Sequence, residues 1–367
     1  KFIYYFIVSS LFWTAFTFIQ TPYFSFLPEI TIDSKSRTSL RAWSVGIGAV
    51  GTIALSASPS ILAACQDAGI SNALSWQITT WFCLAVSVAG YLFCIFRFNK
   101  FDRAATALIL DKPREEGNWF VAVCKNIAYV VKQKGFIFAL LVYFLNLLAY
   151  ICILSLISYV GTHKLGLGAA TISTITLVYT FSRVLFLPIV NKLSAHVGRK
   201  SMLAVVLIGG GVLMCILGLL GVNSATIMII MGFIVGFLGA TYYTLVFTLL
   251  YDLLDLNYLK TGEKKEGEFT AVFLFLGKLG GAFAGSVTGW LLEAIRYDAT
   301  LPAQTPETIQ GLGNIFTYVP GAFYIVAGLI ALAFPIGKKI SDAMGAAVLK
   351  KEHGEEYSTE GFGHLLQ

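Results

Sequence analysis

One stretch decides the fold class of this chain: Glu268-Phe-Thr-Ala-Val-Phe-Leu-Phe-Leu-Gly-Lys-Leu-Gly-Gly-Ala-Phe-Ala-Gly-Ser-Val-Thr-Gly289. It is an apolar run, interrupted by the charge of Lys278, and is long enough to cross a ~30 Å hydrocarbon core as a helix. A charge at the centre of such a helix costs ~3 kcal/mol or more and usually faces a bundle interior or a water-filled path. Either helix end is roughly 15 Å away, too far for Lys278 to snorkel comfortably. We therefore predict a functional role for Lys278.

Glycines recur around this lysine at positions 277, 281, 285 and 289, which form a ridge at four-residue spacing. Glycines at that period let a neighbouring helix approach closely. The ridge has two interpretations, static packing or a water-filled cavity that reaches Lys278 beside its glycine neighbour.

Composition extends the membrane interpretation to the whole chain. Of its 367 residues, 57% are hydrophobic and only 13% are charged, whereas a soluble domain carries about 25% charged residues. The sequence predicts an all-α polytopic membrane protein with nine candidate spans, at residues 2–27, 41–63, 75–97, 136–160, 169–192, 201–222, 225–251, 268–292 and 315–337.

The basic residues predict the orientation of these spans. Placing the 28–40 loop in the cytoplasm puts 21 of the 26 Lys and Arg residues on that side, as the positive-inside bias requires. We therefore expect a cytoplasmic (inner or plasma) membrane location with a cytoplasmic C-terminus. The net charge of +6 then reflects topology, and it does not indicate a nucleic-acid partner.

Enzyme and metal chemistry find no support in the sequence. The six cysteines are scattered without a Cys-x-x-Cys pair, and the four histidines are far apart, so we predict no metal site and no cofactor. A membrane hydrolase or transferase would need clustered His, Asp or Ser residues. We predict that the chain is not an enzyme, and a non-transporting scaffold is the further alternative.

Two hairpins form a weak internal repeat, in which two acids precede a short basic loop. The acids are Glu29 and Asp33 in the first hairpin, and Asp252 and Asp255 in the second. Ion pairs of these acids across a cytoplasmic mouth would hold a gate closed, and solvated loop charges are the equal alternative.

Major-facilitator-type transporters consist of two six-span halves related by such symmetry. The first visible span would then be the fourth of twelve, with three spans missing upstream. Residues 1–97 are then predicted to be the remainder of an N-terminal six-helix bundle, and residues 98–135 a cytoplasmic linker with an amphipathic helix. Residues 136–337 are predicted to form a C-terminal six-helix bundle, and residues 338–367 a cytoplasmic tail.

Several polar and aromatic residues within spans are candidate binding residues. Gln20 and Tyr23 flank Pro22, which kinks a membrane helix, a common device near a binding site. Gln20 would contact a ligand or bond a neighbouring helix. Tyr243 offers an aromatic platform or a packing contact, and for Arg183 we predict a pair within the bundle.

Three segments of the chain match a known family. They are Thr21-Pro-Tyr-Phe-Ser-Phe-Leu-Pro-Glu-Ile-Thr31, the hairpin from Asp252-x-x-Asp255 to Lys260-Thr-Gly-Glu-Lys-Lys-Glu-Gly267, and Lys278 with the glycine pair that follows it. The chain resembles the glycoside–pentoside–hexuronide:cation symporters, the major-facilitator branch that includes melibiose permease. The resemblance implies twelve helices in two bundles and a central site for a sugar or related solute. It also implies alternating access with Na⁺, H⁺ or Li⁺ as the coupling cation.

The resemblance carries over residue by residue. Lys278 looks like the family's lysine beside the cation site, and Tyr243 stands where melibiose permease has a tryptophan that lines the sugar pocket. Gln20 replaces an aspartate that is associated with the sugar and the cation, and Val45 or Ser44 replaces an arginine of the fifth helix.

The superfamily's short basic loop survives as Ala195-His-Val-Gly-Arg-Lys200, which has lost its gating acid. Its basic pair, Arg199 and Lys200, joins the candidate gate residues.

The sequence thus predicts a secondary transporter of a sugar, glycoside or related small solute, coupled to Na⁺ or H⁺ and acting as a monomer in the bilayer. Predicted solute contacts are Gln20, Tyr23, Tyr243 and Lys278. A lysophospholipid symporter of the same branch is the alternative, because such proteins also resemble this branch and carry a lysine on the eleventh helix.

Overall fold

In a computed structural model the chain is built from helices. The structure describes residues 2–30, 34–55, 58–110, 119–133, 135–301 and 303–366. These ranges contain no β-strand. In chain order the elements are α1 (Phe2–Ile30), α2 (Ser34–Leu55), α3 (Ser58–Asp67), α4 (Asn72–Leu110), α5 (Trp119–Val131), α6 (Phe136–Tyr159), the π-helical turn η1 (Val160–Lys164), α7 (Ala169–Val197), α8 (Arg199–Leu220), α9 (Ala225–Thr261), α10 (Glu266–Ala294), α11 (Pro306–Ala333), α12 (Lys338–Glu352) and α13 (Gly363–Leu366).

Seven helices in the described part of the chain are long and apolar enough to cross a membrane: α4, α6 with η1, and α7 to α11. Each of the last seven predicted spans overlaps one of them, which confirms the all-α polytopic fold. The two predicted spans before them are not among the seven. Helix α1 covers the first, whereas the second, 41–63, is divided between α2 and α3. Helix α3 begins at Ser58 with Pro59 in its first turn, where proline starts a new helix readily.

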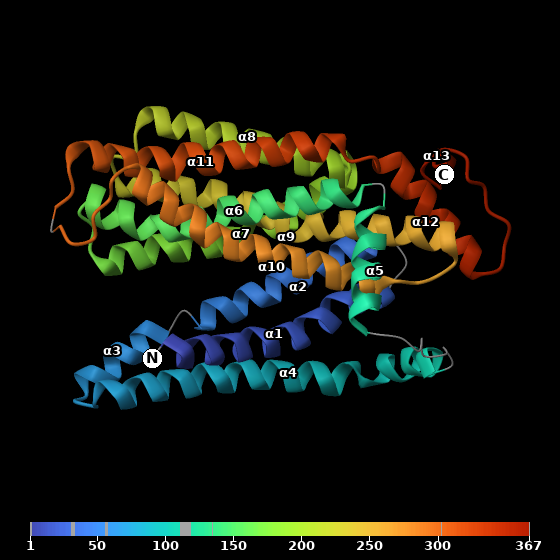
Figure 1. The fold of residues 1–367 in the computed structure, drawn as a ribbon, viewed down its shortest axis with the longest axis horizontal. Coiled ribbons are helices and arrows are strands. Elements are labelled where there is room, and N and C mark those ends of the chain that lie inside the picture. Colours follow the sequence, from blue (N-terminus) through green and yellow to red (C-terminus); the bar gives the residue numbers. More distant parts are fainter. Residues whose placement is uncertain are drawn as a thin grey trace. The chain divides into compact units, whose positions relative to one another are not determined.

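Contacts divide the chain into two compact units, residues 1–45 with 124–367, and residues 46–123. In the first unit, α6 to α11 run side by side as a bundle, and α12 lies at one end of it (Figure 1). In the second unit α3 packs against α4. The predicted domain boundaries, at residues 97, 135 and 337, stay predictions.

Helix α9 is the buried centre of the bundle and is longer than the sequence indicates. The side chain of Ser224 accepts from the backbone N–H of Ile227 at its start, and Gly262, with φ 75°, ends it. A hydroxyl N-cap and a left-handed glycine are favourable helix ends. The helix therefore continues past the predicted end at residue 251, and Asp252 and Asp255 are buried helical residues. The interpretation of these two acids as solvated loop charges is wrong.

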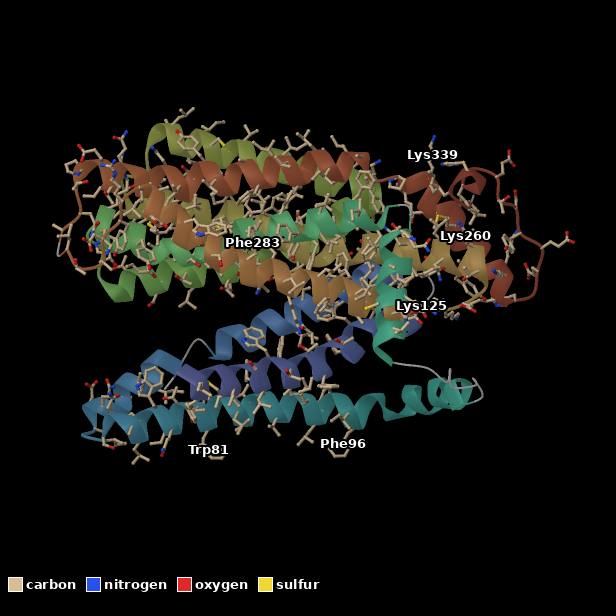
Figure 2. All side chains as sticks on the ribbon, viewed as in Figure 1. Trp81, Phe96, Lys125, Lys260, Phe283 and Lys339 are labelled. Carbon is tan, nitrogen blue, oxygen red and sulfur yellow. The ribbon has the colours of Figure 1, made fainter. Side chains whose placement is uncertain are left out.

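Two helices occupy the predicted linker region. Helix α4 continues beyond the apolar span to Leu110, and α5 covers the segment for which we predict an amphipathic helix. Trp81 and Phe96 point outward from α4, and Lys125 lies on α5 (Figure 2). Trp81 and Phe96 are 68% and 75% exposed, as expected for side chains that face lipid in a membrane.

The glycine ridge of α10 is in close contact with α6 only in its first part. A Cβ atom at Gly277 would overlap the ring of Tyr143, and one at Gly281 would make ordinary contacts of 3.6 and 3.8 Å with α6. In contrast, a Cβ atom at Gly285 or Gly289 would meet no atom of the described residues within 4 Å. Close helix approach therefore explains the beginning of the ridge and leaves its last two glycines unexplained.

This difference predicts opposite effects for two alanine substitutions in one helix. Gly277→Ala should lower the free energy of unfolding by ~1–3 kcal/mol, because the ring of Tyr143 must move to admit the methyl group. Gly285→Ala, the matched control, should be neutral or stabilise by up to ~1 kcal/mol, because alanine favours a helix. Unfolding in one detergent measures both variants. Equal stabilities would show that α6 and α10 do not pack through Gly277.

Candidate functional site

Four tyrosines meet at the middle of α9, and we call them the tyrosine cluster: Tyr143 and Tyr150 of α6, and Tyr242 and Tyr243 of α9. The rings of Tyr143 and Tyr242 stack, with centroids 5.8 Å apart and planes 12° apart. Tyr243 meets Tyr150 edge to face at 6.3 Å, and Tyr242 and Tyr243 are 4.9 Å apart. These are favourable aromatic geometries. The predicted aromatic platform at Tyr243 is thus part of a larger cluster.

Arg41 of α2 is buried against this cluster, with 3% of its surface exposed. Its Nε donates to the backbone carbonyl of Tyr243 over 3.1 Å. Its Cζ lies 4.4 Å from the ring centroid of Phe24 and 4.2 Å from that of Phe247, and these two rings stack on each other. Cation–π contacts of this kind partly offset the cost of burying a guanidinium group.

Arg41 is the site residue that sequence reasoning missed. The predicted second span begins at Arg41, which would place this residue at the end of a helix, but α2 begins at Ser34 and buries Arg41 in its second turn. The polar segment from Ser34 to Ser39 hides the start of the helix from a search for apolar runs. Arg41 precedes Val45 by one helical turn, close to the position where the resemblance expects an arginine.

Arg183 of α7 contacts the same tyrosine through its ring. Its Cζ lies 4.9 Å from the ring centroid of Tyr243. Its Nε is buried and has no hydrogen-bond partner among the described residues. The predicted pair within the bundle is therefore a contact with an aromatic ring rather than with a carboxylate.

Further buried polar atoms near the cluster lack partners in the described part of the chain. They are Gln20 Oε1 of α1, Asn146 Nδ2 of α6, Thr244 Oγ1 of α9 and Tyr179 Oη of α7. Asn146 lies on the α6 face that carries the two cluster tyrosines, Thr244 follows Tyr243, and Tyr179 lies one turn before Arg183. An unsatisfied buried group costs ~1–3 kcal/mol, so these four atoms from separate helices mark places where water or a further molecule can supply hydrogen bonds.

Lys278 reaches α1, the neighbour of α10. Its Nζ donates to Thr17 Oγ1 over 2.5 Å and lies 5.2 Å from the ring centroid of Phe16. The described side chains place no carboxylate within ion-pair distance of it. The adjacent Gly277 faces Tyr143, so the cavity expected beside that glycine is filled by a ring. The role of Lys278 as neighbour of a cation site stays a prediction.

The two predicted contacts on α1 differ in their surroundings. Gln20 lies one helical turn from both Phe16 and Phe24, between the neighbours of Lys278 and those of Arg41. Its Oε1 finds no partner in the described structure, so the interhelical bond that we considered for this atom is not formed there. Tyr23 is 46% exposed, and its hydroxyl is 2.6 Å from Ser44 Oγ of α2.

Two of the candidate gate residues form an ion pair at the α12 end of the bundle. Arg199 at the start of α8 lies 2.9 Å from the Oδ1 of Asp252 on α9. Ser341 of α12 donates to the same Oδ1 over 2.9 Å and accepts a hydrogen bond from Arg199. Lys200 donates to the carbonyl of Phe334. We call Arg199, Asp252 and Ser341 the α12 clasp, because they join α8, α9 and α12.

The clasp has further support nearby. Asp255 is buried one turn along α9, and the ammonium group of Lys351 donates to the carbonyls of Tyr258 and Leu259. Lys264 pairs with Glu352 at 2.6 Å. Partial burial opposes the charge of Lys264, but the hydrogen bond and charge of Glu352 outweigh it and raise its pKa.

Not every candidate gate residue can be placed. Asp33 lies outside the described residues, as does the side chain of Glu29 at the end of α1. A role of the clasp in gating between two halves stays a prediction, because α8, α9 and α12 belong to one unit. No group of three or more His, Cys, Asp or Glu residues in the described part of the chain has the geometry of a metal site.

Comparison with known proteins gives one family and several relatives. The family model described as "MFS/sugar transport protein" matches residues 1–338. The inner membrane symporter YicJ of Escherichia coli K12 is 31% identical over 109 residues, which are 30% of this chain and 24% of that protein. These matches agree with the prediction that the chain is not an enzyme.

Several relatives match over most of this chain. The isoprimeverose transporter of Lactiplantibacillus pentosus is 23% identical over 355 residues, 92% of this chain and 68% of that protein. The symporter YnaJ of Bacillus subtilis is 24% identical over 327 residues, 87% of this chain and 66% of that protein. The chain thus spans about two thirds of these relatives, and a quarter of YicJ is aligned.

The clasp predicts a large effect from a single atom change. Asp252→Asn should lower the free energy of unfolding by ~3–5 kcal/mol, because it removes the buried counter-charge of the partly buried Arg199. Glu352→Gln removes the partly exposed pair with Lys264 and should cost ~1 kcal/mol or less. Unfolding of both variants in the same detergent measures the difference. Similar losses would show that the buried pair does not hold α8, α9 and α12 together.

Proposed function

The chain belongs to the MFS/sugar transport protein family, and on that premise we propose that it is a secondary transporter of a sugar, glycoside or related small solute. A coupling cation, Na⁺ or H⁺, moves with the solute. Alternating access exposes the tyrosine cluster first to one side of the membrane and then to the other. Two relatives are named as symporters, YicJ and YnaJ, and a third as a transporter of isoprimeverose.

The observation that carries this proposal is the set of unpaired polar atoms around stacked aromatic rings. Sugars present apolar ring faces that pack on aromatic side chains and hydroxyl groups that both donate and accept hydrogen bonds. The carbonyl oxygen of Gln20 and the amide nitrogen of Asn146 are an acceptor and a donor without partners in the described bundle. Such a site is matched to a polyhydroxylated ring.

Coupling is assigned to Lys278. Its ammonium group lies on the α1 side of α10, bonded to Thr17, so movement of α1 relative to α10 must break or remake this contact. A cation that enters nearby repels the ammonium group and shifts it. This electrostatic link lets the occupancy of a cation site change the packing of α1 on α10.

The clasp would then act at the cytoplasmic face. On the orientation that the positive-inside bias predicts, the α12 end and the C-terminus face the cytoplasm. Opening the bundle on that side separates α8 from α9 or α12, and the pair of Arg199 with Asp252 is an interaction that such a motion would break. The protein acts as a monomer in this scheme.

A stability–function contrast tests the site. Asn146→Leu should leave the free energy of unfolding unchanged or raise it, because it removes an unpaired buried amide. The same variant should weaken solute uptake at least about tenfold, the loss expected for one good hydrogen bond to a solute. The measurement is uptake of labelled sugars and glycosides into proteoliposomes, alongside unfolding.

The control is Asn257→Leu, at a buried amide that is fully used. Asn257 accepts from the hydroxyl of Tyr129 and donates to the carbonyl of Glu263. Loss of these two hydrogen bonds in Asn257→Leu should lower the free energy of unfolding by ~1–3 kcal/mol. Uptake per folded molecule should change little. If no sugar or glycoside is taken up, or if Asn146→Leu transports normally, the proposed function is wrong.

Replacement of Lys278 tests the coupling role. Lys278→Gln should abolish the dependence of uptake on a Na⁺ or H⁺ gradient while the protein still exchanges solute across the membrane, because the amide does not respond to a cation. Lys339→Gln, at an exposed lysine in the first turn of α12 (Figure 2), should leave the gradient dependence and the solute exchange unchanged. Gradient-driven uptake and solute exchange in the same proteoliposomes separate the two effects. An unaltered gradient dependence in Lys278→Gln would remove this lysine from the coupling mechanism.

A further inference from the structure

We infer that the solute carries an anionic oxygen group, a carboxylate, sulfonate or phosphate, and that the guanidinium groups of Arg41 and Arg183 hold it at the tyrosine cluster. The inference rests on the proposed function, since it takes the cluster as the solute site. It adds the charge of the solute, which the proposed function leaves open.

The first observation is the balance of charge inside the first unit. Arg41, Arg183 and Lys278 all lie on helices of the bundle, and the partners found for them are aromatic rings, a backbone carbonyl and a hydroxyl. All are neutral. The ion pairs found in the described part of the chain lie at the α12 end or in the loop before α10, and they are Arg199 with Asp252, Lys264 with Glu352, and Lys265 with Glu263.

The second observation is the number of unused donors. A guanidinium group has five N–H donors, and the only hydrogen bond of Arg41 among the described residues uses its Nε. The Nε of Arg183 is buried and has no partner in the described structure. Cation–π contacts occupy the faces of the guanidinium groups and leave the N–H groups in their planes available. This fork matches two oxygens of a carboxylate, sulfonate or phosphate.

The third observation is that the two arginines converge on one residue. Arg41 bonds the backbone carbonyl of Tyr243, and Arg183 lies over the ring of the same tyrosine. They come from helices far apart in the chain, α2 and α7. Arg41 lies over Phe247, one turn after Tyr243 on α9, and Arg183 passes Gly239, one turn before it. An anionic group beside Tyr243 is attracted by both cations.

Helix α1 carries residues that lie between the neighbours of Arg41 and those of Lys278. Phe16, Gln20 and Phe24 follow each other at four-residue spacing on α1, and each step rises ~6 Å along the helix. The neighbours of Arg41 therefore lie ~12 Å from those of Lys278 along α1, with Gln20 between them. An anionic group at the arginines leaves the hydroxyl groups of the solute to Gln20.

Matched pairs of compounds test the charge directly in the unmodified protein. The protein is placed in nanodiscs of zwitterionic lipid at fixed ionic strength, and binding is measured by thermal shift. Methyl glucuronide is compared with methyl glucoside, 6-deoxy-6-sulfoglucose with glucose, and lysophosphatidylcholine with a monoacylglycerol of the same chain length. We expect the compound with the anionic oxygen group in at least one pair to bind about tenfold or more tightly than the partner without it, as charge-assisted hydrogen bonds require.

Variants then assign the preference to the arginines. Arg183→Gln and Arg41→Gln should reduce the acid-to-neutral ratio to about one, and the lysine variants of both residues should keep part of it, because the charge remains and the fork is lost. Arg296→Gln is the control, at an exposed arginine in the connection between α10 and α11, and should keep the full ratio. If Arg41→Gln does not fold, the lysine variant and Arg183→Gln still decide.

The outcomes separate this inference from the proposed function. Preference for the sugar acids supports both, whereas preference for lysophosphatidylcholine alone supports the anionic site and contradicts sugar transport. An acid that binds but is not taken up likewise supports the anionic site and contradicts sugar transport. Three results would overturn the inference: equal binding of neutral and acidic partners, no binding of any acid, or an unchanged acid-to-neutral ratio in Arg183→Gln. If a neutral sugar is taken up in that case, the proposed function stays intact.

Discussion

The burial of α9 is the constraint on which the rest of the structure depends. Every residue from Thr244 to Asn257 is buried, so a polar group on this helix has no access to water and must find its partner in the protein. Asp252 meets this requirement through Arg199 and Ser341. The neighbouring helices are thereby fixed around α9, because they must bring matching groups to defined heights along it.

The two regions of α9 meet this requirement in different ways. At the α12 end, a carboxylate, a guanidinium group and a hydroxyl satisfy one another, and the arrangement is complete without any other molecule. At the tyrosine cluster, Arg41 and Arg183 are held by rings, and Asn146 keeps an unpaired amide nitrogen. A cation–π contact gives ~0.5–2 kcal/mol, whereas losing one partner of a buried ion pair costs ~3–5 kcal/mol. The clasp is thus built for stability and the cluster for binding, as local violations of polar satisfaction tend to mark functional sites.

The sequence predicts the fold better than the site, for reasons that particular residues show. Apolar runs define the bundle helices because length and hydropathy suffice to cross a bilayer. The same criterion ends α9 too early at Asp252 and starts α2 too late at Arg41, since it counts a charge as the end of a span. Both charges are buried because residues distant in the chain supply their partners. The contact of Lys278 with Thr17 joins residues 261 positions apart, and no local pattern contains that information. The candidates Gln20, Tyr243 and Lys278 were found through depth in a span and through family resemblance, whereas Arg41 required the packed structure.

Gln20 and the two arginines are connected through the balance of charge. The resemblance places an aspartate at the position of Gln20, one turn from the neighbours of both Lys278 and Arg41. A carboxylate there would neutralise part of the surrounding positive charge by itself, and it would repel an anionic solute at close range. The amide does neither: it leaves the cations uncompensated and offers only a neutral acceptor. Two features then have one explanation: position 20 has no acid, and the arginines have no carboxylate partner in the described bundle. Both follow if the negative charge belongs to the solute instead of the protein. A cation in a membrane interior costs ~3 kcal/mol or more. Only an anionic solute compensates this cost when it binds. The site can therefore discriminate between charged and neutral molecules.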